Sequence, residues 1–178
     1  MAAATPPRAT SRIVLPDEAA TARLGAAIAQ ALQATNEAIG RTGLVIGLSG
    51  ELGSGKTALV RAALRYLGVT GAVRSPTFSL LELYAVSRLN FYHFDFYRFS
   101  KQEDFSVSGF RDFFAPGSVC VIEWPERAGE ACFSVDLQVG MQVVESGRIA
   151  NFDALTQSGR DFLQEMDRAW QASQDGVC

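Results

Sequence analysis

The sequence predicts a single α/β domain in which helices flank a mixed, mostly parallel sheet. Three features of the 178-residue chain predict this fold. Short apolar runs typical of buried strands alternate with segments that have the spacing of amphipathic helices. One glycine-rich loop joins such a run to a helical segment, and acidic residues end two further runs. The length suits one domain with one sizeable core.

The N-terminal part of the chain is expected to hold a tail, a strand and a helix. Residues 1–12 contain no apolar stretch, which predicts a disordered tail rather than a secretory signal; this acid-free segment is also compatible with a short organellar presequence. Residues 13–15 form a short strand, and Asp17 occupies the N-cap position of the next helix. That helix runs from 19 to about 34, where Ala, Leu and Ile recur on one face. A polar connection is expected over 35–43.

A phosphate-binding motif lies between the next apolar run and the next helix. Residues 50–57 match the Gly-x4-Gly-Lys-Thr pattern of the Walker A phosphate loop, or P-loop. The apolar run 44–48 precedes the loop and the helix-forming run 58–67 follows it, which is the strand–loop–helix context that the motif requires. A glycine-rich turn before an ordinary helix is the alternative, and the flanking elements disfavour it. The residues expected to contact nucleotide are Gly50, Glu51, Leu52, Gly53, Ser54, Gly55, Lys56 and Thr57.

The residue types of this motif suit a nucleoside triphosphate with Mg²⁺. Glycines let successive amide N–H groups point into one concavity at a helix N-terminus, where phosphate oxygens bind. Lys56 is expected to place its ammonium near the outer phosphates, and Thr57 its hydroxyl on the metal ion.

A second loop is expected after the phosphate-loop helix, which Gly68 suits as a terminator. Pro76 keeps Ser75 extended, so residues 75–77 are predicted to form an exposed loop before a strand. In nucleotide switches such loops bring a hydroxyl toward the terminal phosphate. Ser75 and Thr77 are therefore candidate nucleotide contacts, with a plain turn as the alternative.

Two carboxylates end predicted strands. In the aromatic-rich run 89–98, alternation places Phe91, His93 and Asp95 on one face and Tyr92, Phe94 and Phe96 on the other. An acid at such a strand end is where phosphate-loop proteins hold a carboxylate near Mg²⁺ and the attacking water, so Asp95 is a candidate catalytic residue. His93 is expected to be structural, and a polar pair of His93 with Asp95 in the core is the alternative.

The run 118–123 repeats this pattern after a helical and irregular segment at 101–117. Glu123 closes the run at the sheet edge where ligands of open α/β sheets bind, so it is a second candidate for the metal site. Trp124, which follows, is expected to pack in the core, with packing on the nucleotide base as the alternative.

Two strands, at 134–139 and 150–155, are expected to be joined by a connection over 140–148. A helix from 159 to about 172 completes the prediction. The expected domain therefore spans 13–172, followed by a flexible C-terminus over 173–178.

Composition and charge restrict the function. The net charge is −3 and no Lys/Arg-rich run occurs, which excludes a typical stand-alone DNA or RNA binder. No apolar stretch of about 18 residues occurs, so no membrane span is predicted. The three cysteines form no Cys-x-x-Cys pair, which favours reduced thiols and a cytoplasmic protein over a disulfide framework or a zinc cluster.

Taken together, these motifs resemble the TsaE family, the small ATPases of bacterial tRNA threonylcarbamoyladenosine biosynthesis. The resemblance covers about 16–163 in matching order, with mild departures at Glu51, Ser54 and Phe99 and a segment at 35–41 that looks longer than usual. The segments that carry it are 48–57, 75–78, 93–98 and 122–127.

The resemblance implies weak ATP hydrolysis that serves two partner proteins, TsaD and TsaB, which transfer the threonylcarbamoyl group to adenosine 37 of tRNA. It implies that the chain meets tRNA only through that complex. By position, Lys56 matches the phosphate-binding lysine and Asp95 the acid near the attacking water. Thr57 and Glu123 match the Mg²⁺ ligands, and residues 75–77 match a switch that faces the terminal phosphate.

Two other functions are possible on the same loop. A small-molecule kinase would need a lid with clustered arginines, whereas the arginines after Arg111 are scattered at 127, 148, 160 and 168. A module that senses ATP without hydrolysing it would share every motif. Arg98 is a candidate contact to phosphate or to a partner, with a solvated surface arginine as the alternative.

Overall fold

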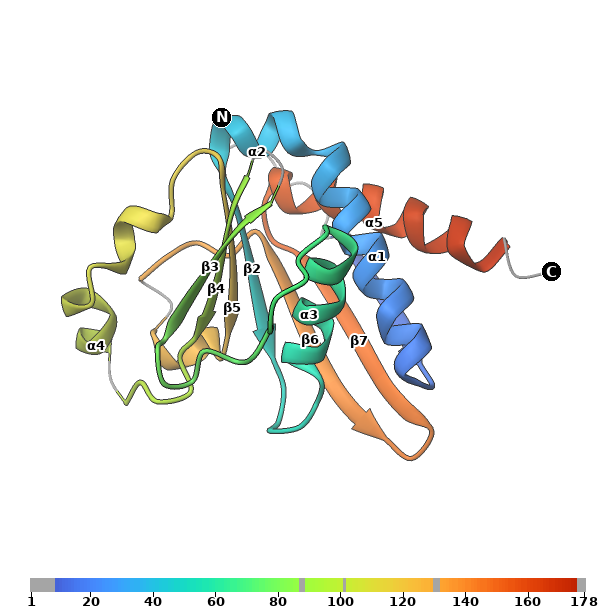
Figure 1. Cartoon of the computed structure of the whole chain (residues 1–178), viewed down its shortest axis with the longest axis horizontal. Coiled ribbons are helices and arrows are strands. Elements are labelled where there is room, and N and C mark those ends of the chain that lie inside the picture. Colours follow the sequence, from blue (N-terminus) through green and yellow to red (C-terminus); the bar gives the residue numbers. More distant parts are fainter. Residues whose placement is uncertain (1–8, 87–88, 101, 130–131, 176–178) are drawn as a thin grey trace, which may run out of the picture.

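The computed structural model describes residues 9–86, 89–100, 102–129 and 132–175 and confirms the α/β prediction. Seven strands form one sheet in the order β1-β7-β6-β2-β5-β4-β3 (Figure 1). The strands are β1 Ala9–Leu15, β2 Leu44–Ser49, β3 Leu81–Val86, β4 Leu89–Asp95, β5 Ser118–Glu123, β6 Leu137–Val144 and β7 Gly147–Ala154. The α-helices are α1 Glu18–Ala34, α2 Asn36–Thr42, α3 Lys56–Tyr66, α4 Gln102–Val107 and α5 Gln157–Asp175; two 3-10 helices are η1 Phe110–Phe113 and η2 Pro125–Arg127.

The sheet is mixed, with its parallel pairings in the centre. Strands β6, β2, β5 and β4 are parallel, whereas β3 at one edge and β7 and β1 at the other pair antiparallel. Every residue of β5 is buried, as expected for a central strand that is covered on both faces. The carboxyl ends of the four parallel strands therefore meet at one edge of the sheet.

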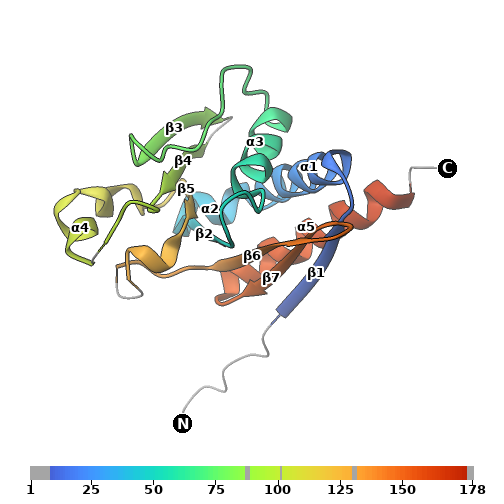
Figure 2. The ribbon, with the colours of Figure 1, turned by 90° about the horizontal axis from the view of Figure 1, so that it is seen from below.

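Helices cover the two faces of the sheet unequally, as Figures 1 and 2 show. The larger core packs side chains of α1, α3 and α5 against one face, and the smaller core is aromatic and packs against α4 and η1. Strand β4 alternates between them, since Phe91 belongs to the first core and Phe94 to the second. This alternation confirms the predicted faces of the strand.

The first helix begins where the sequence predicts. The Asp17 carboxylate accepts a 2.7 Å hydrogen bond from the Ala20 backbone N–H and caps α1. The segment after it differs from the expected polar connection, because α2 forms over Asn36–Thr42. Ile39 is buried in the larger core, and its packing there stabilises this short helix despite the polar composition of the segment.

Regular structure extends further than expected at both ends of the described part of the chain. Strand β1 starts at Ala9, which lies opposite Ala154 of β7, so residues 9–12 belong to the sheet and not to the predicted tail. Residues 1–8 lie outside the described part. Helix α5 extends to Asp175, three residues past the predicted domain end. The expected connection at 140–148 is instead the extended arms of the β6–β7 hairpin.

Two further predictions concern cysteines and membrane helices. Cys120 and Cys132 are free thiols in the interior, and burial raises the pKa of the Cys120 thiol to about 12. Cys178 lies outside the described residues. Within the described ranges, no helix combines the length and the hydropathy needed to cross a membrane.

Candidate nucleotide-binding site

The glycine-rich loop after β2 has the backbone geometry of an anion nest. Gly50, Gly53 and Gly55 have φ angles of 134°, 81° and 103°, a region that residues with a side chain rarely adopt. A Cβ on Gly50 would overlap the carbonyl oxygen of Met141 in β6, so this glycine is also needed for close packing. The loop leads directly into α3, whose first residues are Lys56 and Thr57. The amides at this helix start suit phosphate binding.

The Lys56 side chain folds back over the loop. Its ammonium donates hydrogen bonds to the carbonyl oxygens of Gly50, at 2.7 Å, and Glu51, at 3.0 Å. Only 4% of the residue is exposed, and this burial lowers the pKa of the amine, although Glu123 and Asp95 oppose the shift. An anion in the loop would be a stronger partner for this ammonium than neutral carbonyl oxygens.

The two predicted carboxylates end neighbouring strands beside the loop. Asp95 of β4 lies opposite Glu123 of β5, and Glu123 lies opposite Leu48 of β2. Both acids are buried. The predicted site residues of the loop and of the two strand ends are therefore gathered at one edge of the sheet.

Glu123 connects the loop helix to β4. Its Oε1 accepts a 2.7 Å hydrogen bond from the Thr57 hydroxyl and lies 3.0 Å from Nε2 of His93. The alternative in which His93 pairs with Asp95 is therefore wrong. His93 is fully buried, and its Nδ1 has no hydrogen-bond partner among the described residues. Its role as a support of Glu123 depends on the pairing of β4 with β5, which no local sequence signal reveals.

Asp95 holds the loop at 75–77. Its carboxylate accepts hydrogen bonds from the hydroxyls of Ser75 and Thr77, the latter at 2.7 Å, and from the Tyr97 backbone N–H at 2.9 Å. Pro76 is buried and both Ser75 and Thr77 are half-buried, so this loop is less exposed than expected. The candidate switch residues thus contact a candidate catalytic acid directly.

Trp124 is not a core residue. It is half-buried at the mouth of the loop, with its ring centroid 4.2 Å from the Lys56 ammonium. Its φ angle of 60° turns the chain sharply after Glu123. Leu80, whose carbonyl accepts from the Asp95 N–H, has a φ of 64°. Each of the two carboxylates is thus next to a strained backbone residue, as is common at functional sites.

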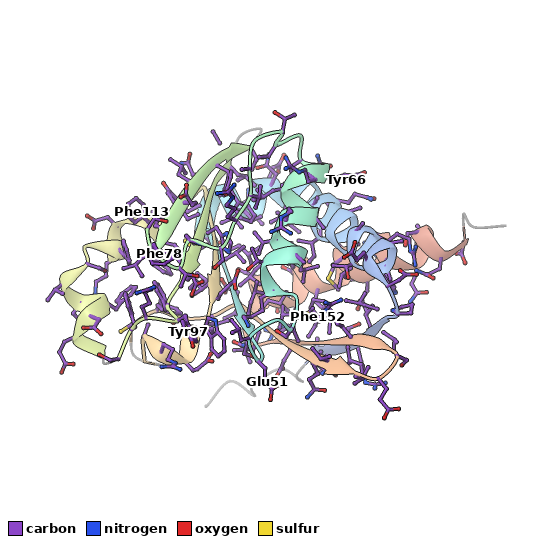
Figure 3. The ribbon with its side chains drawn as sticks, turned by 60° about the horizontal axis from the view of Figure 1, so that its bottom comes forward. Glu51, Tyr66, Phe78, Tyr97, Phe113 and Phe152 are labelled. Carbon is purple, nitrogen blue, oxygen red and sulfur yellow. The ribbon has the colours of Figure 1, made fainter. Side chains whose placement is uncertain are left out.

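Aromatic and basic residues form the rim beside the 75–77 loop. The Arg98 guanidinium lies 4.2 Å from the centroid of Phe78, whose side chain is 86% exposed, and Arg127 lies over Tyr97 at 5.6 Å. Figure 3 shows Phe78 and Tyr97 on the β3–β4 side of the loop that carries Glu51. Arg98 is thus stacked on the rim, and nothing in this geometry assigns it to a phosphate.

The oxygen atoms of Thr57 and Glu123 suit Mg²⁺. In the described part of the chain no three His, Cys, Asp or Glu residues cluster as a metal cage. Mg²⁺ commonly binds through one or two protein oxygens together with phosphate oxygens and waters, so a cage is not required. The donor set fits a hard cation that a bound nucleotide helps to hold.

A buried strand, a glycine-rich loop at a helix start and acids on adjacent strand ends define a P-loop nucleotide-binding domain. The family model "Threonylcarbamoyl adenosine biosynthesis protein TsaE" matches residues 15–150, which is more than half of the chain. The chain therefore belongs to the TsaE family, a P-loop ATPase family.

Similar proteins and a solved structure agree with this family assignment. The chain is 33% identical to "tRNA threonylcarbamoyladenosine biosynthesis protein TsaE" of Haemophilus influenzae, over 84% of this chain and 92% of that protein. It is 35% identical to the protein of the same name from Treponema pallidum, over 71% of this chain and 87% of the relative. The crystal structure of Bacillus subtilis YdiB superposes with a TM-score of 0.64 at 26% identity, covering 91% of this chain and 95% of that one.

Proposed function

We propose that this protein binds and hydrolyses Mg-ATP in tRNA threonylcarbamoyladenosine biosynthesis, and that hydrolysis resets a complex of TsaD and TsaB homologues. One observation carries the proposal: the Thr57 hydroxyl and the Glu123 carboxylate lie 2.7 Å apart beside the phosphate loop, with Asp95 opposite Glu123 on the next strand. Family membership and the names of the relatives support the pathway.

The proposed reaction is hydrolysis of the terminal phosphoanhydride. Water forms a bond to the γ-phosphorus, the bond to the β–γ bridging oxygen breaks, and ADP and phosphate leave with the proton of the water. Mg²⁺ neutralises charge on the phosphate oxygens when it is bound. Lys56 balances charge at the outer phosphates, while Thr57 and Glu123 hold the metal.

Asp95 has a different proposed role, because its carboxylate binds the hydroxyls of Ser75 and Thr77. In this proposal the carboxylate orients the attacking water, and the 75–77 loop changes position when the terminal phosphate is lost. Such a rearrangement would make the partner surface depend on the nucleotide.

The proposed partners are the TsaD and TsaB homologues, and tRNA is reached only through them. The net charge of −3 argues against binding of free nucleic acid. The proposed compartment is the cytoplasm.

Phosphate release and nucleotide binding test the proposal in the wild type and three variants. Lys56→Ala is expected to lose nucleotide binding, because the loop loses its buried cation. Asp95→Asn and Glu123→Ala are expected to retain ADP binding and to lose most of the hydrolysis, about 10²-fold or more. Addition of the TsaD–TsaB pair is expected to raise the wild-type rate.

Two results would contradict hydrolysis at this site. Unchanged turnover in all three variants would discard the residue assignment. Nucleotide binding without phosphate release, alone or with the partners, would favour an ATP sensor. ATP-dependent phosphorylation of metabolites would instead revive the small-molecule kinase.

A further inference from the structure

Arg148 is a cation beside the phosphate loop that neither the motif nor the proposed chemistry uses. It is the second residue of β7, which runs antiparallel to β6 and so begins at the edge where β6 and the other parallel strands end. Because the phosphate loop leaves β2 at that same edge, the start of β7 lies at the level of the loop. The β6–β7 hairpin beside the loop is visible in Figure 1.

The Arg148 side chain packs directly against the loop. A Cβ built on Gly55 would lie 3.0 Å from both Cδ and Nε of Arg148, and 3.5 Å from Cε of Met141. Gly55 is the N-cap residue of α3 and has a φ of 103°. The Cδ and Nε atoms of Arg148 therefore lie against the loop backbone, whose amides are expected to face the phosphates.

The Nε–H donor of this half-buried arginine lacks an acceptor in the described part of the chain. The Nε of Arg148 is buried and has no hydrogen-bond partner, and the described residues provide no ion pair for the group. Arginine stays charged in proteins, and a buried N–H donor of a charged group is energetically unfavourable without a hydrogen-bond partner. An anion that enters the loop would supply the missing acceptor.

The order of the strands indicates which part of a nucleotide lies near Arg148. Asp95 and Glu123, on β4 and β5, are on one side of β2, whereas β6 and β7 are on the other side. If the reacting terminal phosphate faces the acids, the opposite side of the loop faces the nucleoside end. The anionic group of the nucleotide that lies nearest to the nucleoside is the α-phosphate.

We propose that Arg148 is a nucleotide-binding residue that donates hydrogen bonds to the α-phosphate of ADP and ATP. This inference rests on the proposed function, since it needs a nucleotide in the loop. In this role Arg148 strengthens nucleotide binding and does not accelerate hydrolysis. The α-phosphate keeps its charge through hydrolysis, so its contact with Arg148 is the same before and after the reaction. A purely structural Arg148 would act through the packing of its aliphatic stem against Gly55, which a methionine at this position retains.

Calorimetric titration of the full chain with ADP and with ATP tests the proposal. Arg148→Met keeps the aliphatic packing against Gly55 and removes the charge, and Arg148→Ala removes both. Both variants are expected to bind ADP and ATP about tenfold or more weakly, by a similar factor for the two nucleotides. In steady-state assays KM is expected to rise while kcat stays close to the wild-type value.

Arg168→Ala is the matched control, because that exposed arginine on α5 pairs with Glu165 away from the loop. It is expected to bind like the wild type. Nucleotide affinity in Arg148→Met within twofold of wild type would overturn the inference while leaving the proposed function intact. A loss restricted to ATP would also overturn it, because the contact would then be to the γ-phosphate. Failure of the wild type to bind either nucleotide would instead overturn the proposed function and this inference together.

Discussion

At the scale of single residues, Glu123 is the point where the loop helix and β4 meet. One carboxylate oxygen serves both the Thr57 hydroxyl and the His93 ring. A buried carboxylate with two fixed partners has few rotamers open to it, so its position relative to the loop is set before any ligand arrives. His93 contributes to this order without contacting the loop, which makes it a positioning residue.

His93→Phe is expected to keep the ring packing and to remove the hydrogen bond to Glu123. Hydrolysis should fall about tenfold or more, because the carboxylate is less well oriented. The affinity for ADP should change less than twofold, since Lys56 and the loop amides are untouched. The free energy of unfolding should fall by about 1–2 kcal/mol. Phosphate-release assays, ADP titration and urea denaturation measure the three effects.

Tyr92→Phe is the control for this substitution, because Tyr92 is the preceding residue of β4 and packs into the aromatic core on the other face. It should leave hydrolysis unchanged. Equal losses of hydrolysis and ADP affinity in His93→Phe would show that the ring supports the whole loop rather than Glu123.

At the scale of elements, the site depends on how closely α1 and α3 pack. A Cβ on Gly25 of α1 would overlap the Cβ of Ala62 on α3, with the Ala63 backbone nitrogen only 2.7 Å away. Neither Gly25 nor Ala62 has a reactive side chain, yet the contact between them determines how far α3 lies from the sheet. Lys56 and Thr57, at the start of that helix, are therefore positioned partly by α1.

Gly25→Ala is expected to destabilise the protein by about 1–3 kcal/mol, because the added methyl group overpacks the contact between the helices. It should also weaken nucleotide binding as α3 shifts. Gly40→Ala is the matched control: Gly40 lies in α2, and a Cβ there would meet nothing within 4 Å. That change should stabilise the fold by about 0.5–1 kcal/mol. Urea denaturation measures the free energy of unfolding of both variants. If the two substitutions change it in the same direction, the argument that Gly25 is needed for close packing of α1 on α3 is refuted.

At the scale of the whole molecule, one sheet edge gathers groups from four strands, while the two cores lie on opposite faces of that sheet. The loop, the acids and the start of the β6–β7 hairpin therefore come together only when the sheet is formed. A ligand that binds only this assembled edge stabilises the native state as a whole, because unfolding separates the strands.

The midpoint temperature of thermal unfolding is expected to rise with Mg-ADP or Mg-ATP. At a free nucleotide concentration of 100 times Kd, the bound nucleotide should add about 2.7 kcal/mol to the free energy of unfolding. The stabilisation should keep rising with the logarithm of the free nucleotide concentration and be absent in Lys56→Ala. Differential scanning calorimetry across a nucleotide series measures it. A similar shift in Lys56→Ala would place the nucleotide somewhere other than the loop.

The local features were predictable because each depends on neighbours in the sequence. The phosphate loop, the Asp17 cap and the two strand-end acids all follow from spacing and residue type within a few positions. Strand alternation also predicted which face of β4 each aromatic residue takes. Hydrogen-bond geometry and period-two alternation act over this short range, so one sequence suffices to recognise them.

The remaining features came from pairings between distant segments. His93 meets Glu123, 30 residues away, because β4 and β5 are adjacent and in parallel register. Residues 9–12 form a strand because β7 offers them an edge, and Arg148 reaches Gly55 because β6 and β7 extend beside the loop. Periodicity tells which way a side chain points and not what lies opposite it. The sequence alone thus determined most of the elements and the residue types of the loop. The tertiary structure decided which charged groups meet, since strand order minimises the free energy of the whole sheet rather than of any segment.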